Sequence, residues 1–453
     1  MVPSIKNKVQ TFLNVGHERT LKIKRNIIYT FLIKGISVLI SFMLIPLTIN
    51  YLNNTQYGIY ITIASLVGWI STFDIGLSNG LRNKLARALA LDDYDDMVKD
   101  ISTTYALLVL IASVIFVVVF IASTFFNWND LLKAPASLIF SIWPVLVITL
   151  TAFCIQFVLQ PINSILIATH QPFKSSLILL IGQVLTYLLT YGLTLYTSGN
   201  LYLLVLIVTG APVLVLLLAN VYLFSTSLRA FVPRFKAIYL KHAKNLLNIG
   251  GAFFFIQMGA LVIYETDNII ITRVLGPHEV TTFNIPFKYF SIITIIFTII
   301  ITPYWSAFTD AYARDDFDWI KRSVKKMRML WLGFALLAIV LYFFSGIFYK
   351  LWIKEMVTIP DALSLAIAIY TIVQTWMVIH IYLLNGVGKL RIQLILVLST
   401  SVVNIPLSIF LIKQIGLPGL VLANILVIFI MNIFITWQCK LIMEKRASGI
   451  WNR

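Results

Sequence analysis

The acidic stretch Leu91-Asp92-Asp93-Tyr94-Asp95 reappears 223 residues later as Arg314-Asp315-Asp316-Phe317-Asp318. This spacing is close to half of the 453-residue chain, and both copies stand between strongly apolar segments. Self-similarity at a fixed offset predicts a chain built from two homologous halves. In membrane proteins, a site between two such halves can open to either side in turn. The duplication therefore points to a two-lobed membrane architecture.

The composition is that of a membrane protein. Hydrophobic residues make up 59% of the chain and charged residues 12%, and the mean hydropathy is +0.91. Soluble domains carry about 25% charged residues. A helix needs ~20 apolar residues to span a bilayer, and the segment 175–228, without a single Asp, Glu, Lys or Arg, is long enough for two spans. We expect an all-α polytopic membrane protein with about twelve transmembrane helices in two parallel six-helix lobes around a central cavity.

The apolar runs and the turn signals between them define the expected spans. These are roughly 26–50, 57–80, 101–126, 138–168, 175–197, 201–224, 246–274, 279–305, 329–350, 359–384, 391–412 and 417–438. Six spans per half is an even number, so both halves point the same way. The expected segments are a cytoplasmic N-terminal segment (1–25), an N-lobe (26–224), a basic cytoplasmic linker (225–245), a C-lobe (246–438) and a cytoplasmic tail (439–453).

The distribution of basic residues predicts the orientation. With the N-terminus in the cytoplasm, 28 of the 35 lysines and arginines fall in segments on the inner side. Such an asymmetry is a strong positive-inside signal and predicts that both termini are cytoplasmic. It also explains the net charge of +17 through anionic membrane lipids. No nucleic-acid partner is needed.

The sequence carries no catalytic signature. Gly386-Val387-Gly388-Lys389 lacks the spacing of a P-loop, and His278-Glu279 is an isolated pair. Two cysteines cannot form a zinc site or a disulfide framework. The longest expected outer loops, 127–137 and 351–358, are too short to hold an enzyme site. We therefore expect no enzyme activity, no cofactor and no metal site.

Two lysines lie within expected spans, where a charge is costly and by default faces a cavity or a partner. Lys34 lies about nine residues into the first span, and Lys288 lies about as deep in the eighth. Either lysine can line a cavity or belong to a buried structural pair.

Acidic residues also lie within spans. Asp74 shares a helix face with Arg82, so it can act as a cation-coupling or gating carboxylate or be satisfied structurally. In span seven, Glu265 and Asp267 point to opposite faces, and we expect one of them to line the central cavity. Arg273, near the outer end of that span, can bond the last carbonyls of its helix.

Four stretches resemble a known family, the Wzx-like oligosaccharide and O-antigen flippases. They are Tyr51-Leu52-Asn53-Asn54-Thr55-Gln56-Tyr57-Gly58-Ile59-Tyr60, Asp74-Ile75-Gly76-Leu77-Ser78-Asn79-Gly80-Leu81-Arg82-Asn83-Lys84-Leu85-Ala86, Asp267-Asn268-Ile269-Ile270-Ile271 followed by Leu275-Gly276-Pro277, and Asn385-Gly386-Val387-Gly388-Lys389. In span count and loop lengths the likeness covers nearly the whole chain. The family belongs to a superfamily shared with the multidrug and toxin extruders and the lipid II flippase.

The resemblance implies that the chain moves an undecaprenyl-diphosphate-linked oligosaccharide from the inner to the outer leaflet of a bacterial plasma (inner) membrane by alternating access. The implied purpose is cell-surface polysaccharide assembly, with a polysaccharide polymerase as a partner. Lys34, Lys288 and Arg273 would then meet the diphosphate. One of Asp74, Glu265 and Asp267 would couple a proton or Na⁺, with Arg82 beside Asp74.

Two other functions remain open at this point. A cation-coupled multidrug antiporter of the same superfamily would need acidic residues to dominate the cavity, and the two lysines within spans argue against it. A membrane glycosyltransferase or polymerase would need a catalytic cluster and larger outer loops. A major-facilitator transporter fits the span count, but its usual Asp-Arg-Gly-Arg-Arg-type loop is absent from 82–100.

Overall fold

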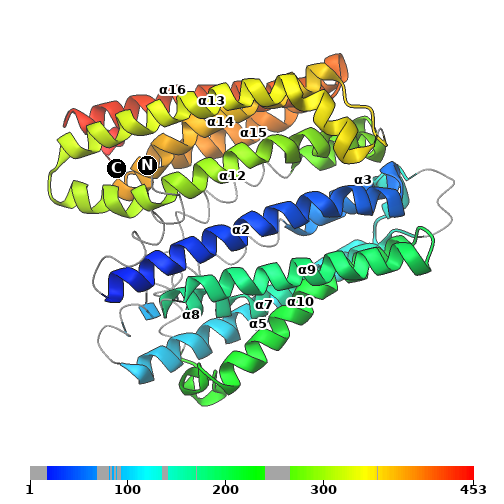
Figure 1. The fold of residues 1–453 in the computed structure, drawn as a ribbon, viewed down its shortest axis with the longest axis horizontal. Helices are drawn as coiled ribbons and strands as arrows, with labels where there is room; N and C mark the ends of the chain where they lie inside the picture. Colours follow the sequence, from blue (N-terminus) through cyan, green and yellow to red (C-terminus); the bar gives the residue numbers. More distant parts are fainter. Residues whose placement is uncertain are drawn as a thin grey trace, which may run out of the picture. The chain divides into compact units, whose positions relative to one another are not determined.

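The structure, a computed structural model, describes residues 18–68, 81, 84–85, 88, 93–134, 141–169, 171–239, 266–354 and 356–452. These residues are almost entirely helical and include no strand (Figure 1). Ten of the described helices are long and apolar enough to cross a membrane. Two more expected spans are described in part, as α3 (Asn54–Gly68) and a helix over 266–274. The expected all-α polytopic membrane fold is confirmed.

Several helices extend beyond the apolar segments from which the spans were predicted. The helices of the ten spans are α2 (Glu18–Tyr51), α5 (Tyr94–Thr124), α7 (Trp143–Leu159) with the short α8 (Pro161–Ala168) in one span, α9 (Pro172–Tyr196), α10 (Leu201–Ser225), α12 (Pro277–Ala313), α13 (Phe317–Ile353), α14 (Asp361–Val387), α15 (Arg391–Ile415) and α16 (Leu417–Met443). Hydropathy detects only the part of a helix that lies in lipid, so it misses polar turns at the ends. The expected span 138–168 contains two helices, because Pro161 cannot donate a backbone hydrogen bond and starts α8 afresh.

The chain forms two compact units, each described here by itself. The first unit comprises 1–51, 74–125 and 144–250; the second comprises 52–73, 126–143 and 251–453. This grouping by contacts assigns α3 to the second unit, whereas the duplication places it in the first half. Spatial grouping and sequence duplication are different properties, so the predicted lobes 26–224 and 246–438 stay a prediction.

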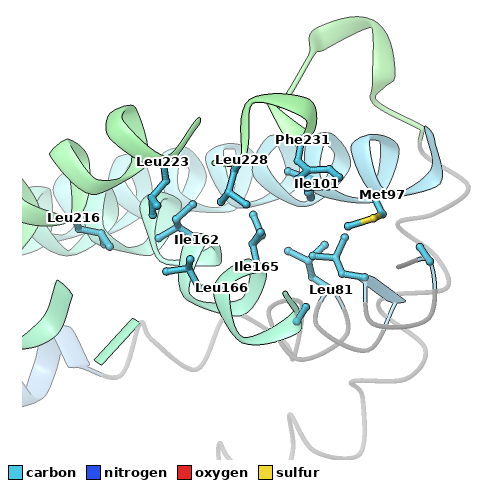
Figure 2. Close-up of a cluster of buried hydrophobic side chains, with 13 residues drawn as sticks. Leu81, Met97, Ile101, Ile162, Ile165, Leu166, Leu216, Leu223, Leu228 and Phe231 are labelled. Atoms are coloured by element: carbon cyan, nitrogen blue, oxygen red, sulfur yellow. The ribbon is translucent and has the colours of Figure 1, made fainter. Parts of the chain in front are cut away.

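In the first unit, α2 packs on α9, and α9 packs on α10. One end of this unit holds a hydrophobic cluster formed by α5, α8, α10 and the short 3₁₀ helix η2 (Arg229–Phe231) (Figure 2). Ile101 of α5, Ile165 of α8 and Leu228 before η2 are among its fully or almost fully buried members. The cluster fixes the ends of three membrane helices to one another.

In the second unit, α12 packs on α3 and α14, and α16 packs on α14 and α15. Two glycines allow close approach. A Cβ at Gly58 would collide with the backbone carbonyl of Pro277, where α3 meets α12. A Cβ at Gly386 would lie 2.7 Å from the backbone carbonyl oxygen of Trp305, where α14 meets α12. Small residues at such contacts let membrane helices pack backbone to backbone.

The repeated acidic stretch has the same local structure in both copies. Asp93 is the N-cap of α5 and Asp316 is the N-cap of α13, and each side chain accepts a hydrogen bond from the backbone N–H three residues later at 3.0 Å. The backbone N–H groups of Asp93 and Asp316 themselves donate to the carbonyl oxygens of Ala88 and Ala311, at 3.0 Å and 2.9 Å. The two acids therefore cap the N-termini of equivalent helices, which is a common role of aspartate.

Candidate functional site

The helix over 266–274 carries the buried acid of the second unit. Asp267 is only 4% exposed, and its carboxylate Oδ2 accepts a hydrogen bond from Asn424 Nδ2 of α16 at 2.7 Å. The carbonyl oxygen of Asn424 in turn accepts from Asn404 Nδ2 of α15 at 2.7 Å. Asn404 thereby orients the amide of Asn424 toward the acid. The three side chains form a buried relay across three helices.

The next residue along this helix serves a second set of contacts. Successive helix positions lie about 100° apart, so Asn268 faces different neighbours from Asp267. Its amide Nδ2 donates to Ser65 Oγ of α3 at 2.7 Å, and its carbonyl oxygen accepts from Asn284 Nδ2 of α12 at 2.8 Å. One turn later, the hydroxyls of Thr272 and Thr62 lie 2.7 Å apart. Asp267, Asn268 and Thr272 thus connect this helix directly to α3, α12 and α16.

This arrangement suits a cation or a proton. A lone carboxylate is expensive in the bilayer core and is kept where it has partners or a functional role. Oxygen ligands are also what hard cations such as Na⁺ require. In the relay, the buried Oδ1 atom of Asn404 has no hydrogen-bond partner within the described ranges. The same holds for Ser408 Oγ, one turn later on α15. The site therefore combines one titratable acid with oxygen atoms that are available to a ligand.

The two lysines expected to meet substrate lie in different units. Lys34 is exposed on α2 in the first unit. Lys288 is half-buried on α12 in the second unit, one turn after Asn284 of the polar network. Each is described within its own unit, so their joint lining of a cavity stays a prediction.

Arg273 has a structural contact that the sequence did not indicate. Its guanidinium Nη1 donates to the backbone carbonyl oxygen of Leu131 at 3.1 Å and lies 3.5 Å from that of Asp130. These carbonyls end α6 (Trp128–Leu131), so Arg273 caps another helix and not its own. The side chain is exposed, and its binding of a diphosphate remains a prediction.

Three of the expected site residues, Asp74, Arg82 and Glu265, lie outside the described residues. Their roles remain predictions.

The sequence did not predict the amide and hydroxyl side chains of the network. Only charged residues within spans were candidates, and Asn404, Asn424 and Asn284 carry no charge. Their signal was a polar residue in an otherwise apolar run. That signal does not say which of many such residues meet, because the meeting depends on helix packing.

The fold defines a class: a multi-pass α-helical membrane protein. The sequence profile of the family described as "Polysaccharide biosynthesis protein" matches residues 23–309, which is more than half of the chain. The chain belongs to this family. The profile of a second family, MatE, matches 252–410. Both matches agree with the resemblance drawn from the motifs.

Curated relatives and solved structures agree with these family matches. A Yersinia pseudotuberculosis protein named for O-antigen export is 22% identical over 79% of this chain and 81% of its own length. A Salmonella typhimurium protein named as an O-antigen transporter is 22% identical over 88% and 91%. An inward-facing multidrug resistance MATE family transporter superposes with a TM-score of 0.69 at 15% identity, covering 98% of this chain and 99% of its own. An outward-facing one gives 0.64 at 14% identity, covering 97% and 99%. At these identities the structures show the fold alone.

Proposed function

We propose that this protein is a flippase that moves an undecaprenyl-diphosphate-linked oligosaccharide from the inner to the outer leaflet of a bacterial inner membrane, for assembly of a cell-surface polysaccharide such as O-antigen. The observation that carries the proposal is the family match over 23–309. Two relatives named for O-antigen export or transport support the substrate class.

The proposed mechanism is alternating access between the lobes 26–224 and 246–438, joined by the linker 225–245. Solved transporters of this fold carry names that describe inward-facing and outward-facing conformations. A fold that reaches both conformations can offer its site to each leaflet in turn. Both termini lie in the cytoplasm, by the positive-inside asymmetry.

Asp267 is the proposed coupling residue, with a proton or Na⁺ as the ion. It is the buried acid at the end of a relay that passes through Asn424 of α16 to Asn404 of α15. Binding or release of one cation changes the charge of this relay and so shifts the preferred packing of the helices around it. Asp74 and Glu265 are proposed as further coupling or gating acids, with Arg82 beside Asp74.

Lys34 and Lys288 are proposed to hold the diphosphate, and Arg273 to meet it at the outer end of its helix. Lysine is a common phosphate ligand, acting as a compact point charge. Partners would be the lipid-linked oligosaccharide, membrane lipids and a polysaccharide polymerase that receives the product.

Translocation of a fluorescent undecaprenyl-diphosphate oligosaccharide in proteoliposomes tests the substrate and the two lysines. Lys34→Ala and Lys288→Ala should each lower the rate by roughly tenfold or more, because a charge-assisted hydrogen bond contributes about 1.5–3 kcal/mol. Lys350→Ala, an exposed lysine in the last turn of α13, is the matched control and should keep the rate. Full activity in both lysine variants, with normal folding, would show that the cationic-cavity proposal is wrong.

The same vesicles test coupling. With an imposed Na⁺ or pH gradient, Asp267→Asn should lose the acceleration that the gradient gives, while retaining binding of the lipid-linked sugar. Asp361→Asn, an exposed acid in the first turn of α14, should behave as wild type. Gradient-driven transport by well-folded Asp267→Asn at the wild-type rate would exclude the coupling role.

A cation-coupled multidrug antiporter is the second candidate, favoured by the MatE match over 252–410. It predicts efflux of a cationic dye from loaded cells, which corresponds to dye uptake into inverted vesicles, under a Na⁺ or proton gradient. Dye efflux without any flipping of lipid-linked sugar would select this alternative.

A further inference from the structure

A large groove in the second unit lies apart from the Asp267 network. Its volume is about 990 Å³, and α13, α14, α16 and the C-terminal 3₁₀ helix η4 (Gly449–Asn452) line it. Along α16 the lining runs from Phe429 to Met443. These fourteen steps of helix rise roughly 21 Å, which is more than half of the ~30 Å hydrocarbon core. The groove is therefore long enough to reach from the headgroup level through the depth of one leaflet.

The groove is apolar along most of its length and open to the side. Phe429 and Ile433, one turn apart on α16, are each 55% exposed, and Phe434 is 43% exposed. Exposed aromatic and aliphatic side chains on a membrane helix face lipid tails. Such a surface accepts acyl chains without displacing water.

One end of the groove is cationic. Arg328 of α13 and Lys440 of α16 both line it, and none of the described residues that line it is acidic. The Arg328 Nη2 lies 3.0 Å from His380 Nε2, and His380 Nδ1 lies 3.0 Å from the carbonyl oxygen of Trp376. A histidine that donates from Nδ1 to a carbonyl is neutral when it accepts at Nε2. Arg328 thus keeps its full positive charge, and its buried Nε has no hydrogen-bond partner in the part of the chain that the structure describes.

Tryptophans surround this charged end. The Arg328 guanidinium lies 5.3 Å from the centre of the Trp376 ring, and the Lys440 ammonium lies 5.4 Å from that of Trp437. Trp451 of η4 forms another wall, with its carbonyl oxygen held by Gln438 Nε2 at 3.1 Å. Tryptophan gathers at the level of lipid headgroups. The cations therefore lie where a phosphate group would be found, at the side that the charge distribution assigns to the cytoplasm.

We infer that this groove binds an anionic glycerophospholipid of the surrounding leaflet, with its phosphate on Arg328 and Lys440 and its acyl chains along α16. Charge complementarity selects an anionic headgroup over a zwitterionic one. The two cations come from different helices, so a bound phosphate bridges α13 and α16. The site is independent of the proposed transport substrate.

Thermal unfolding of the full-length protein in a neutral detergent, with added lipid, tests the inference. Phosphatidylglycerol should raise the Tm in a concentration-dependent way, and phosphatidylcholine should raise it less, because a ligand of the native state stabilises it by mass action. The double variant Arg328→Gln/Lys440→Gln should weaken the apparent affinity for phosphatidylglycerol about tenfold. Lys440→Gln alone, at an exposed position, should show part of this loss even if loss of Arg328 impairs folding.

Lys326→Gln is the matched control, because Lys326 is exposed on α13, two residues from Arg328, and does not line the groove. It should respond to phosphatidylglycerol as wild type does. Equal Tm shifts with both lipids, or equal losses in Lys326→Gln and Lys440→Gln, would overturn the proposal. So would mass spectrometry of purified protein that finds a polyprenyl diphosphate, and no glycerophospholipid, retained by Arg328 and Lys440.

Discussion

The two units contain related grooves with different polar linings. In the first unit, the lining of a groove of about 710 Å³ includes Tyr105 of α5, Asn220 of α10 and Arg229 of η2. Tyr105 stands 223 residues before Arg328, the offset of the duplicated acidic stretch. Asn220 donates from Nδ2 to the last carbonyl of α7 at 3.1 Å, as Asn432 of α16 donates to a carbonyl of α14 at 3.0 Å.

The two grooves differ in the hydrogen-bond partner of the asparagine side-chain oxygen. The Tyr105 hydroxyl donates to Asn220 Oδ1 at 2.8 Å, which satisfies the amide internally. At the equivalent position Arg328 turns to His380 instead, and Asn432 Oδ1 is left without a hydrogen-bond partner among the described residues. The first groove thus satisfies its asparagine oxygen internally, while the second leaves the oxygen of Asn432 without such a partner in the described chain.

The largest expected effect comes from breaking the packing frame of the second unit. Gly58→Ala places a Cβ against the Pro277 carbonyl and must move α3 from α12. Overpacking of this kind costs about 1–3 kcal/mol, and more when backbone blocks the way. We expect a Tm lowered by several degrees in detergent.

The control for Gly58→Ala is Gly35→Ala in the first unit. No atom of the described residues lies within 4 Å of a Cβ built at Gly35 on α2, so this variant should be neutral or slightly stabilising. Equal losses in the two variants would contradict the close contact at the α3–α12 seam.

The next effect tests an ion pair that only the first copy has. The Lys84 ammonium lies 3.0 Å from Asp100 Oδ1, and the Asp100 side chain is 3% exposed. Its repeat counterpart is the buried Ser323. Asp100→Ala leaves a partly buried lysine unpaired and should cost about 2 kcal/mol, measured by thermal unfolding. Ser323→Ala should cost less than Asp100→Ala, and the reverse order would refute the assignment.

A smaller effect sharpens the comparison of the two grooves. Tyr105→Phe removes the hydroxyl that satisfies Asn220 and makes the first groove resemble the second. We expect a loss of about 1 kcal/mol, the usual net contribution of one hydrogen bond. Tyr222→Phe on α10, where the side chain is 68% exposed, is the control. A stability unchanged by Tyr105→Phe would show that the two grooves differ less than their contacts indicate.

The smallest effect tests the equivalence of the two copies. Asp93→Ala and Asp316→Ala each remove an N-cap and should each cost about 1 kcal/mol. Asp95→Ala, an exposed acid that caps no helix, should cost less. Thermal unfolding of the three variants, followed by circular dichroism, gives the comparison. Clearly unequal losses of stability in Asp93→Ala and Asp316→Ala would show that the two caps are not equivalent.

The sequence predicted the fold well because lipid imposes a strong constraint: long runs without charge have to be helices. The duplicated acids marked equivalent places in the two halves, and the structure makes Asp93 and Asp316 the N-caps of α5 and α13. The expected span 359–384 ended too early, since α14 continues to Val387 and ends at Gly388 with a φ of 74°.

Contacts between residues far apart in the sequence were harder to predict. Arg328 was assigned to an inner loop, whereas the structure places it eleven residues into α13, because a helix continues past its apolar segment. Asp267 was identified by its charge, but its relay through Asn424 and Asn404 joins helices far apart in sequence. Which amide meets which acid is decided by packing, and one sequence does not record that.

The content of the buried relay limits how much work one transport cycle can draw from a gradient. Of Asp267, Asn424 and Asn404, only Asp267 can ionise. If that acid is the coupling group, one elementary charge moves per cycle. Such a charge yields about 2.3 kcal/mol per 100 mV of membrane potential. At about 1.4 kcal/mol per factor of ten, that energy sustains roughly a fiftyfold concentration ratio of cargo between the two leaflets.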